Sequence, residues 1–203
     1  MAETVAELLR VPSGAVDLSA YDPRATPGLA GGKQRGKQAL EELGPGLADL
    51  QERLFAESKA GGERRVLLVL QGMDTSGKGG VMRHCVGLMD PQGVDITTFK
   101  APTASERRHD FLWRVERRTP QPGMVGIFDR SHYEDVLIGR VRELAKPAEI
   151  ERRYGAINDF EQAPGRHRYH HRQVLPAHLQ GRAEGAAARS PGRPHQTLEV
   201  QLR

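Results

Sequence analysis

VLLVLQGMDTSGKGG, residues 66–80, is the stretch that decides the fold. It begins with aliphatic residues without polar alternation, which is typical of a strand buried on both faces, as in a parallel sheet. The run then breaks into a glycine-rich loop in which Gly72 and Gly77 lie five residues apart and Lys78 follows directly. That spacing is typical of a P-loop, whose backbone N–H groups and following helix N-terminus bind phosphate oxygens. A glycine-rich surface turn with an incidental lysine is the alternative that we consider second.

The loop departs from the common P-loop pattern at Gly79, which stands where a Ser or Thr would offer a hydroxyl to magnesium. Another group must then help to bind the metal. Asp74, inside the loop, is the candidate, because a carboxylate suits a hard cation and would otherwise repel the phosphates. The loop residues that we predict to bind phosphate are Gly72, Thr75, Ser76, Gly77, Lys78 and Gly79.

Composition bounds the kind of protein and its partners. The 203 residues suffice for one domain of ordinary size, and a net charge of +4 favours an anionic partner. Cys85 is the only cysteine, so an intrachain disulfide is excluded. Neither a signal peptide nor a stretch of membrane-spanning length is visible, and we therefore expect a cytoplasmic protein.

Apolar spacing predicts alternating helices and strands along the chain. We expect an irregular arm over residues 1–32, then a helix from Lys33 to Ala60 that Gly44-Pro45-Gly46 kinks or divides into two. The leucines of this helix favour core packing, with a dimer through the same face as the alternative. The further elements that we expect are helices at Lys78–Met89, Ser105–Arg118, up to Leu144 and at Pro147–Ala163, and strands at Val94–Phe99 and Met124–Phe128.

Asp129 and Arg130 directly follow the third predicted strand. Open α/β sheets bind ligands at the carboxyl ends of their strands, and a carboxylate there is the usual second magnesium ligand of a P-loop enzyme. Arg130 is then able to reach a transferring phosphate. We predict a three-layer α/β fold of the P-loop kinase type with a parallel sheet, and phosphoryl transfer or nucleotide hydrolysis as its chemistry.

From Val66 to Ala163 the chain resembles the family-2 polyphosphate kinases, or polyphosphate:nucleotide phosphotransferases. The motifs that carry the resemblance are GMDTSGKGG, FKAPT, HDFLWR, FDRSHYEDVL and RYGAINDFEQA. The resemblance implies magnesium-dependent phosphoryl transfer between inorganic polyphosphate and a nucleotide (ADP, GDP or AMP), in a homo-oligomer without a membrane partner. By the same resemblance, Asp74 and Asp129 hold Mg2+ and orient the acceptor, and Lys78 and Arg130 bind the transferring phosphate. The residues that it suggests for the polyphosphate path are Lys100, His109, Arg114 and Arg140.

The character of the sequence changes after Ala163. Residues 164–203 contain no Lys, Asp, Ile, Phe or Met, yet they hold five of the eight histidines. Reverse translation of residues 168–180, read one base later, permits Gly-Thr-Thr-Ile-Val-Lys-Phe-Phe-Leu-His-Ile-Ser-Lys, which resembles a strand of the family. The constraint is specific, because Gln173, Gln180 and Glu184 permit only Lys or Arg in that frame. Our hypothesis is that one base was gained, or two were lost, near the Ala163 codon.

This hypothesis divides the chain into three parts. Residues 1–62 form an N-terminal arm and helices, residues 63–163 the P-loop phosphotransferase core, and residues 164–203 an aberrant, disordered tail. We then expect the sheet and the lid to be incomplete at the C-terminus, with no strand from the tail. Three functions stay open: a polyphosphate-dependent nucleotide kinase, a non-catalytic fragment that only binds nucleotide or polyphosphate, and, last, a P-loop module whose basic tail binds nucleic acid.

Overall fold

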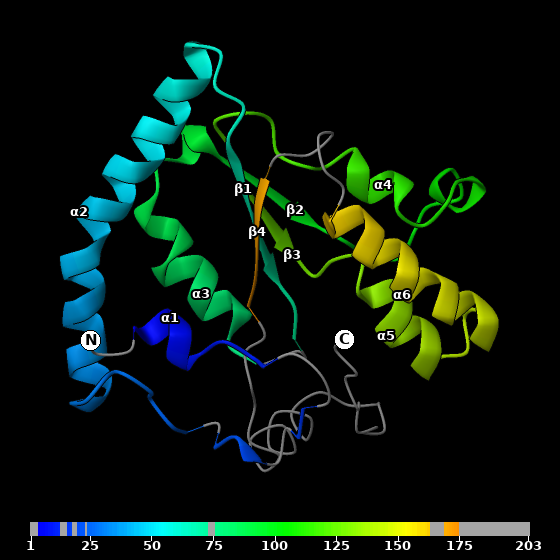
Figure 1. Ribbon diagram of the computed structural model, residues 1–203, viewed down its shortest axis with the longest axis horizontal. Helices are drawn as coiled ribbons and strands as arrows, with labels where there is room; N and C mark the ends of the chain where they lie inside the picture. The colour runs from blue at the N-terminus through cyan, green and yellow to red at the C-terminus, as the bar shows by residue number, and fades with distance from the viewer. Residues whose placement is uncertain are drawn as a thin grey trace. The chain divides into compact units, whose positions relative to one another are not determined.

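The apolar run that opens the P-loop motif forms an inner strand of a parallel sheet (Figure 1). The computed structural model describes residues 4–12, 16–17, 20–22, 24–72 and 76–162, and the backbone of residues 169–174. The chain divides into two compact units, of which the larger, Gly44–Pro176, contains the sheet. The described strands are β1 (Arg65–Leu70), β2 (Val94–Thr98), β3 (Val125–Asp129) and β4 (Tyr169–Val174).

The strands lie in the order β2-β3-β1-β4, and all three neighbouring pairs are parallel. In this register Leu70 pairs with Asp129, and Asp129 pairs with Thr98. The carboxyl ends of β1, β2 and β3 therefore lie together at one edge of the sheet. The predicted α/β class with a parallel sheet is confirmed.

Helices and short 3₁₀ turns connect the strands. The described helices are α1 (Val5–Leu8), α2 (Gly32–Lys59), α3 (Lys78–His84), α4 (Trp113–Glu116), α5 (Glu134–Val141) and α6 (Pro147–Gln162), and the 3₁₀ turns are η2 (Val86–Leu88), η3 (Pro91–Gly93) and η4 (Glu106–Arg108). α1 is a single turn that begins with a capping box between Thr4 and Glu7, inside the arm predicted to be irregular. None of the described helices is both long and apolar enough to cross a membrane.

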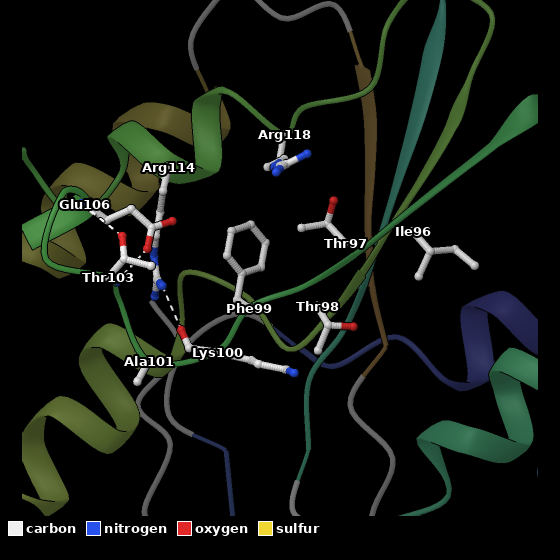
Figure 2. A pocket seen from close by; sticks show the side chains of 10 residues that line it. All are labelled: Ile96, Thr97, Thr98, Phe99, Lys100, Ala101, Thr103, Glu106, Arg114 and Arg118. Atoms are coloured by element: carbon white, nitrogen blue, oxygen red, sulfur yellow. Dashed lines mark hydrogen bonds between the residues drawn. The ribbon is translucent and has the colours of Figure 1, made fainter.

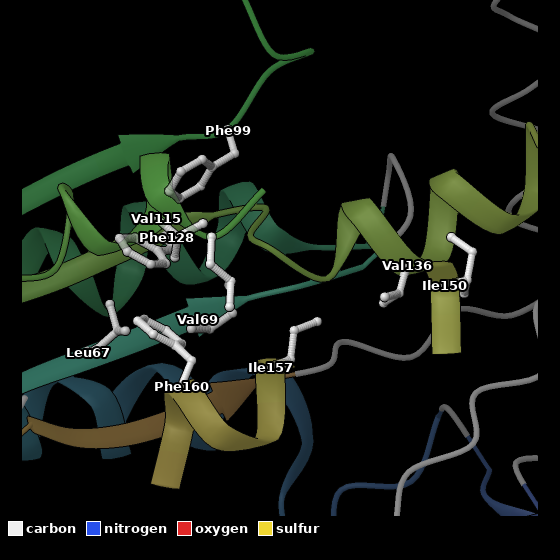
Figure 3. Packing of buried hydrophobic residues seen from close by; sticks show 10 residues of the cluster. Leu67, Val69, Phe99, Val115, Phe128, Val136, Ile150, Ile157 and Phe160 are labelled. Carbon is white, nitrogen blue, oxygen red and sulfur yellow. The ribbon is translucent and has the colours of Figure 1, made fainter. Parts of the chain in front are cut away.

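Alternate residues of β1 pack on opposite faces of the sheet. Leu67 and Val69 face a core made with α4, α5 and α6, in which Phe128, Val115 and Phe160 are buried (Figure 3). The other core contains Leu70, with residues of α3 and the C-terminal half of α2 packed against it. This explains the unbroken apolar run in the sequence, because both faces of β1 are covered.

β4 corrects the expectation that the tail contributes no strand. Residues 169–174 pair in parallel with all six residues of β1, from Arg65↔Tyr169 to Leu70↔Val174. Strand pairing is made by backbone N–H and C=O groups, which every residue of this segment possesses, so a run without apolar periodicity still completes a ladder. The disorder predicted for residues 164–168 and 175–203, and the predicted incompleteness of the lid, concern residues outside the described part of the chain.

Two local helix predictions have different outcomes. The helix expected over residues 105–118 is two short pieces, η4 and α4, separated by His109 in extended conformation. Asp110 accounts for the break, because its carboxylate accepts a hydrogen bond from the Leu112 N–H at 3.2 Å and so competes with helical pairing. Of the two outcomes expected for the first long helix, division at Gly44-Pro45-Gly46 is not observed, because α2 is one helix that contains Pro45. The alternative, a kink, stays a prediction.

Candidate phosphate-binding site

A hydrogen bond from the Lys78 side chain connects the two sides of the glycine-rich loop, Gly72 before it and Lys78 after it. Its Nζ donates a hydrogen bond to the Gly72 carbonyl oxygen at 2.7 Å, which places the ammonium group across the loop. Gly77 has a φ of 99°, a left-handed conformation that favours glycine, and its carbonyl accepts hydrogen bonds from the N–H groups of Gly80 and Val81. Residues 73–75 lie outside the described part, so the roles of Asp74 and Thr75 stay predictions.

Ser76 is a buried hydroxyl within this loop. Its side chain belongs to a residue that is 8% exposed, and its Oγ has no hydrogen-bond partner among the described residues. A buried polar group left without a partner costs about 1–3 kcal/mol. Within the described part of the chain, the loop therefore contains a buried polar atom that is available to a ligand. Gly79, in contrast, is open, because a Cβ added there would meet nothing within 4 Å.

Asp129 and Arg130 lie beside the strand that leads into the loop. Asp129 pairs with Leu70, and the Arg130 N–H donates to the Leu70 carbonyl at 3.1 Å. The Asp129 carboxylate is half-buried and makes no hydrogen bond or ion pair with any described side chain. Arg130 adopts a φ of 63°, which is rare outside glycine, and its guanidinium lies 3.8 Å from the Glu134 carboxylate. Parallel pairing thus places Asp129 and Arg130 beside Leu70, two residues before the glycine-rich loop begins at Gly72.

A buried glutamine connects these two segments, and sequence reasoning missed it. Gln71 Nε2 donates to Glu134 Oε1 at 2.8 Å, and Gln71 Oε1 accepts from Ser131 Oγ at 3.0 Å. Ser131 also accepts a hydrogen bond from the Tyr133 N–H at the start of α5. The spacing of Ser131 and Glu134 is that of a capping box and predicts a helix start, but it gives no signal for their contacts with Gln71.

Lys100 and Arg114 line a cavity of about 330 Å³ beside β2 (Figure 2). Arg114 is buried, and its guanidinium donates to the Lys100 carbonyl at 2.7 Å and to Asp135 Oδ2 at 3.3 Å. The ammonium end of Lys100 points away from Arg114. The remaining residues that line the cavity are Ile96, Thr97, Thr98, Phe99, Ala101, Thr103, Glu106 and Arg118.

Comparison with known proteins places this arrangement in a family. Residues 31–172 match the family model described as polyphosphate kinase 2 (PPK2). The chain belongs to the PPK2 family. The matched region extends past Ala163 into β4, beyond the part in which the motifs were found in the sequence.

Relatives agree with this assignment over most of the chain. An AMP/ADP-polyphosphate phosphotransferase of Meiothermus ruber is 43% identical over 150 residues, which are 74% of this chain and 55% of the relative. An ADP-polyphosphate phosphotransferase of Rhodopseudomonas palustris is 41% identical over 126 residues, which are 62% of this chain and 42% of the relative. The chain thus spans about half the length of these curated relatives.

A solved structure supports the fold. The crystal structure of polyphosphate kinase 2 from Arthrobacter aurescens TC1 superposes with a TM-score of 0.86 at 51% sequence identity. The superposition covers 94% of this chain and 68% of that chain. This PPK2 chain therefore has the same parallel α/β architecture as a solved structure of its family.

Two residues predicted for the polyphosphate path are exposed on this PPK2 chain. His109 is exposed and stacks on Trp113, with ring centroids 4.0 Å apart and an interplanar angle of 9°. Arg140 is exposed on α5 and makes no side-chain hydrogen bond or ion pair within the described residues. Neither contacts Lys78 or Asp129 through a described hydrogen bond, so their roles stay predictions.

The donors at the sheet edge fit a hard metal ion. The described residues contain no group of three or more His, Cys, Asp or Glu side chains arranged for a metal. Mg2+ needs no such cage, because it is commonly held by one or two carboxylates together with substrate phosphates and water. The half-buried Asp129 carboxylate, which has no protein partner in the described part of the chain, suits that mode of binding.

Proposed function

We propose that this chain catalyses magnesium-dependent phosphoryl transfer between inorganic polyphosphate and a nucleoside mono- or diphosphate. The observation that carries the proposal is the pairing of Leu70 with Asp129, which sets Asp129 and Arg130 beside the glycine-rich loop within a chain of the PPK2 family. The names of the relatives, AMP/ADP- and ADP-polyphosphate phosphotransferase, support AMP or ADP as the acceptor, with GDP as a further candidate.

The proposed roles follow from charge and position. Lys78 and the N–H groups at the start of α3 bind phosphate oxygens, while Arg130 binds the phosphoryl group in transfer. Asp129, together with Asp74, would hold Mg2+, which supplies neutralisation of phosphate charge when bound. Phosphoryl transfer needs little covalent help from a protein, so these residues act by positioning reactants and by stabilising charge.

The proposal is tested by incubating the purified chain with polyphosphate, Mg2+ and AMP, ADP or GDP in separate reactions, and separating the products by chromatography. We expect the acceptor to gain a phosphate in the presence of Mg2+ and not in excess EDTA. Asp129→Asn should reduce the rate at least about 100-fold, since it removes a charge used in transition-state stabilisation. Asp95→Asn, at an exposed carboxylate on β2, is the matched control and should leave the rate unchanged.

The same experiment distinguishes the binding-only alternative. If folded protein binds nucleotide or tripolyphosphate in calorimetry but forms no product with any acceptor, the catalytic proposal is wrong and the non-catalytic fragment remains. A salt-dependent affinity for DNA without turnover would favour the nucleic-acid alternative.

A further inference from the structure

We propose that Glu134 is a positioning residue that orients the Arg130 guanidinium toward bound phosphate, with Gln71 fixing Glu134 to the strand before the loop. The inference rests on the proposed function, since it assigns phosphate as the ligand of Arg130. It explains why a carboxylate stands beside a site for a polyanion, where a free negative charge would oppose binding.

The two oxygens of Glu134 have different partners. Oε1 accepts the hydrogen bond from Gln71 Nε2 at 2.8 Å, and Oε2 lies 3.8 Å from Arg130 Nη1. The second distance exceeds that of a hydrogen bond, so the carboxylate attracts the guanidinium without a direct hydrogen bond between these two atoms. Glu134 thus bridges a fixed amide and a cation that is about 40% exposed.

Gln71 is itself held firmly in place. The residue is 9% exposed and directly follows Leu70, the last residue of β1, while its Oε1 accepts from Ser131 Oγ. Ser131 is fully buried and directly follows Arg130. The glutamine amide therefore makes two hydrogen bonds to the segment that follows β3, one with Ser131 and one with Glu134.

The backbone of Arg130 is fixed by the same strand. Its N–H donates to the Leu70 carbonyl at 3.1 Å, and its φ of 63° is a conformation that costs free energy and persists only where the surroundings impose it. The end of β1 and the residue after it thus hold Arg130 twice, at its backbone through Leu70 and at its side chain through Gln71 and Glu134. This arrangement lowers the entropy that the guanidinium would lose on binding phosphate.

The direction of the effect separates positioning from simple electrostatics. If Glu134 were only a nearby negative charge, Glu134→Gln would tighten the binding of a polyanion. If Glu134 acts through Arg130, Glu134→Gln weakens that binding although it removes a negative charge. The glutamine still offers Gln71 an oxygen acceptor, so the contact to β1 is expected to survive the substitution.

The experiment is a double-mutant cycle on the full chain with tripolyphosphate as the probe, measured by calorimetry. We expect Glu134→Gln to weaken binding about tenfold in the presence of Arg130, and to have no weakening effect in an Arg130→Ala background. Glu134→Asp, which keeps the charge on a shorter side chain, should lie between Glu134→Gln and the unaltered chain. Glu151→Gln, at an exposed carboxylate of α6, is the matched control, and thermal unfolding checks that each variant is folded.

Equal losses in both backgrounds, or tighter binding by Glu134→Gln in the presence of Arg130, would overturn the inference, as would absence of tripolyphosphate binding by the unaltered chain. The proposed function fails differently. If the chain binds tripolyphosphate but transfers no phosphate to any acceptor, catalysis is excluded while the binding cycle still decides the role of Glu134. If the chain is active, Glu134→Gln should lower kcat in the presence of Arg130 but not in the Arg130→Ala background, and it should change KM for the acceptor less than kcat.

Discussion

At the scale of single residues, a substitution of Ser76 should affect ligand binding without lowering the stability of the fold. Ser76→Ala removes a buried Oγ that has no partner among the described residues, so it should leave the thermal unfolding midpoint unchanged or slightly raised. A hydrogen bond to a charged ligand is worth about 1.5–3 kcal/mol, so the same substitution should weaken tripolyphosphate binding by about 10- to 100-fold. Calorimetry and thermal unfolding on the same samples measure both effects.

Ser76→Thr serves as the control, because it keeps a hydroxyl in the loop and should retain most of the affinity. Equal affinity of the serine and alanine forms for tripolyphosphate would show that this hydroxyl does not face the ligand. A hydroxyl that does contact phosphate or its metal would make up for Gly79, where the sequence lacks the usual Ser or Thr.

At the scale of elements, hydrogen bonds from Arg114 connect the segment after β2 with α5. Its guanidinium donates to the Lys100 carbonyl and to Asp135, and both partners of this ion pair are largely buried. Arg114→Ala would leave Asp135 with less compensation for its buried charge, and removing one partner of such a pair costs about 3 kcal/mol or more. Urea unfolding should therefore show a large fall in the free energy of unfolding.

Arg118 provides the comparison for that prediction. It is exposed and lines the same cavity, so Arg118→Ala should change the free energy of unfolding by less than about 0.5 kcal/mol. If both variants are as stable as the unaltered chain, Arg114 does not hold this segment. The position of Arg114 thus adds a structural task to the phosphate-binding role that the family resemblance suggests.

The first turn of α6 gives a prediction in pH. Hydrogen bonds from Arg152 and Arg153 lower the pKa of the Glu149 carboxyl from 4.5 to about 2. A carboxyl whose pKa is depressed by folding stabilises the folded state above its unfolded pKa, and this contribution is lost as the pH falls from about 4.5 to about 2. We expect thermal unfolding midpoints of the unaltered chain and of Glu149→Gln to converge over that range. Curves that stay parallel between pH 6 and pH 3 would contradict this, and because the pair is exposed, added salt should shrink the difference.

The same elements show how far the sequence alone leads. The strands at 66–70 and 125–129 were predictable because their apolar runs are buried between layers, and the strand at 94–98 is rich in β-branched residues. The spacing of glycines and lysine located the loop. The contacts of Gln71 were not predictable, because they join residues about 60 positions apart that only the parallel register brings together. The break at Asp110 depends on one side-chain hydrogen bond that outweighs the helical pattern around it.

At the scale of the whole molecule, the place of β4 bears on the reading frame of the gene. The strand covers residues 169–174, and the shifted codons for these residues permit Thr-Thr-Ile-Val-Lys-Phe. Except for Lys, these residue types are enriched in strands, and an inner strand such as β1 calls for a neighbour of this kind on its second edge. The chain as it stands places Tyr-His-His-Arg-Gln-Val there instead.

We therefore predict that the nucleotide sequence near the Ala163 codon contains one base more, or two fewer, than an uninterrupted frame of the family. A gene restored to that frame should yield a chain with a thermal unfolding midpoint at least about 5 °C higher, because burying one large aliphatic or aromatic side chain contributes about 1.5–3 kcal/mol. A second variant of the same chain length, with the tail residues from 175 onward scrambled in the present frame, controls for length and should gain nothing. An uninterrupted frame in the nucleotide sequence, or a restored chain no more stable than the present one, would leave the histidine-rich segment as the native partner of β1.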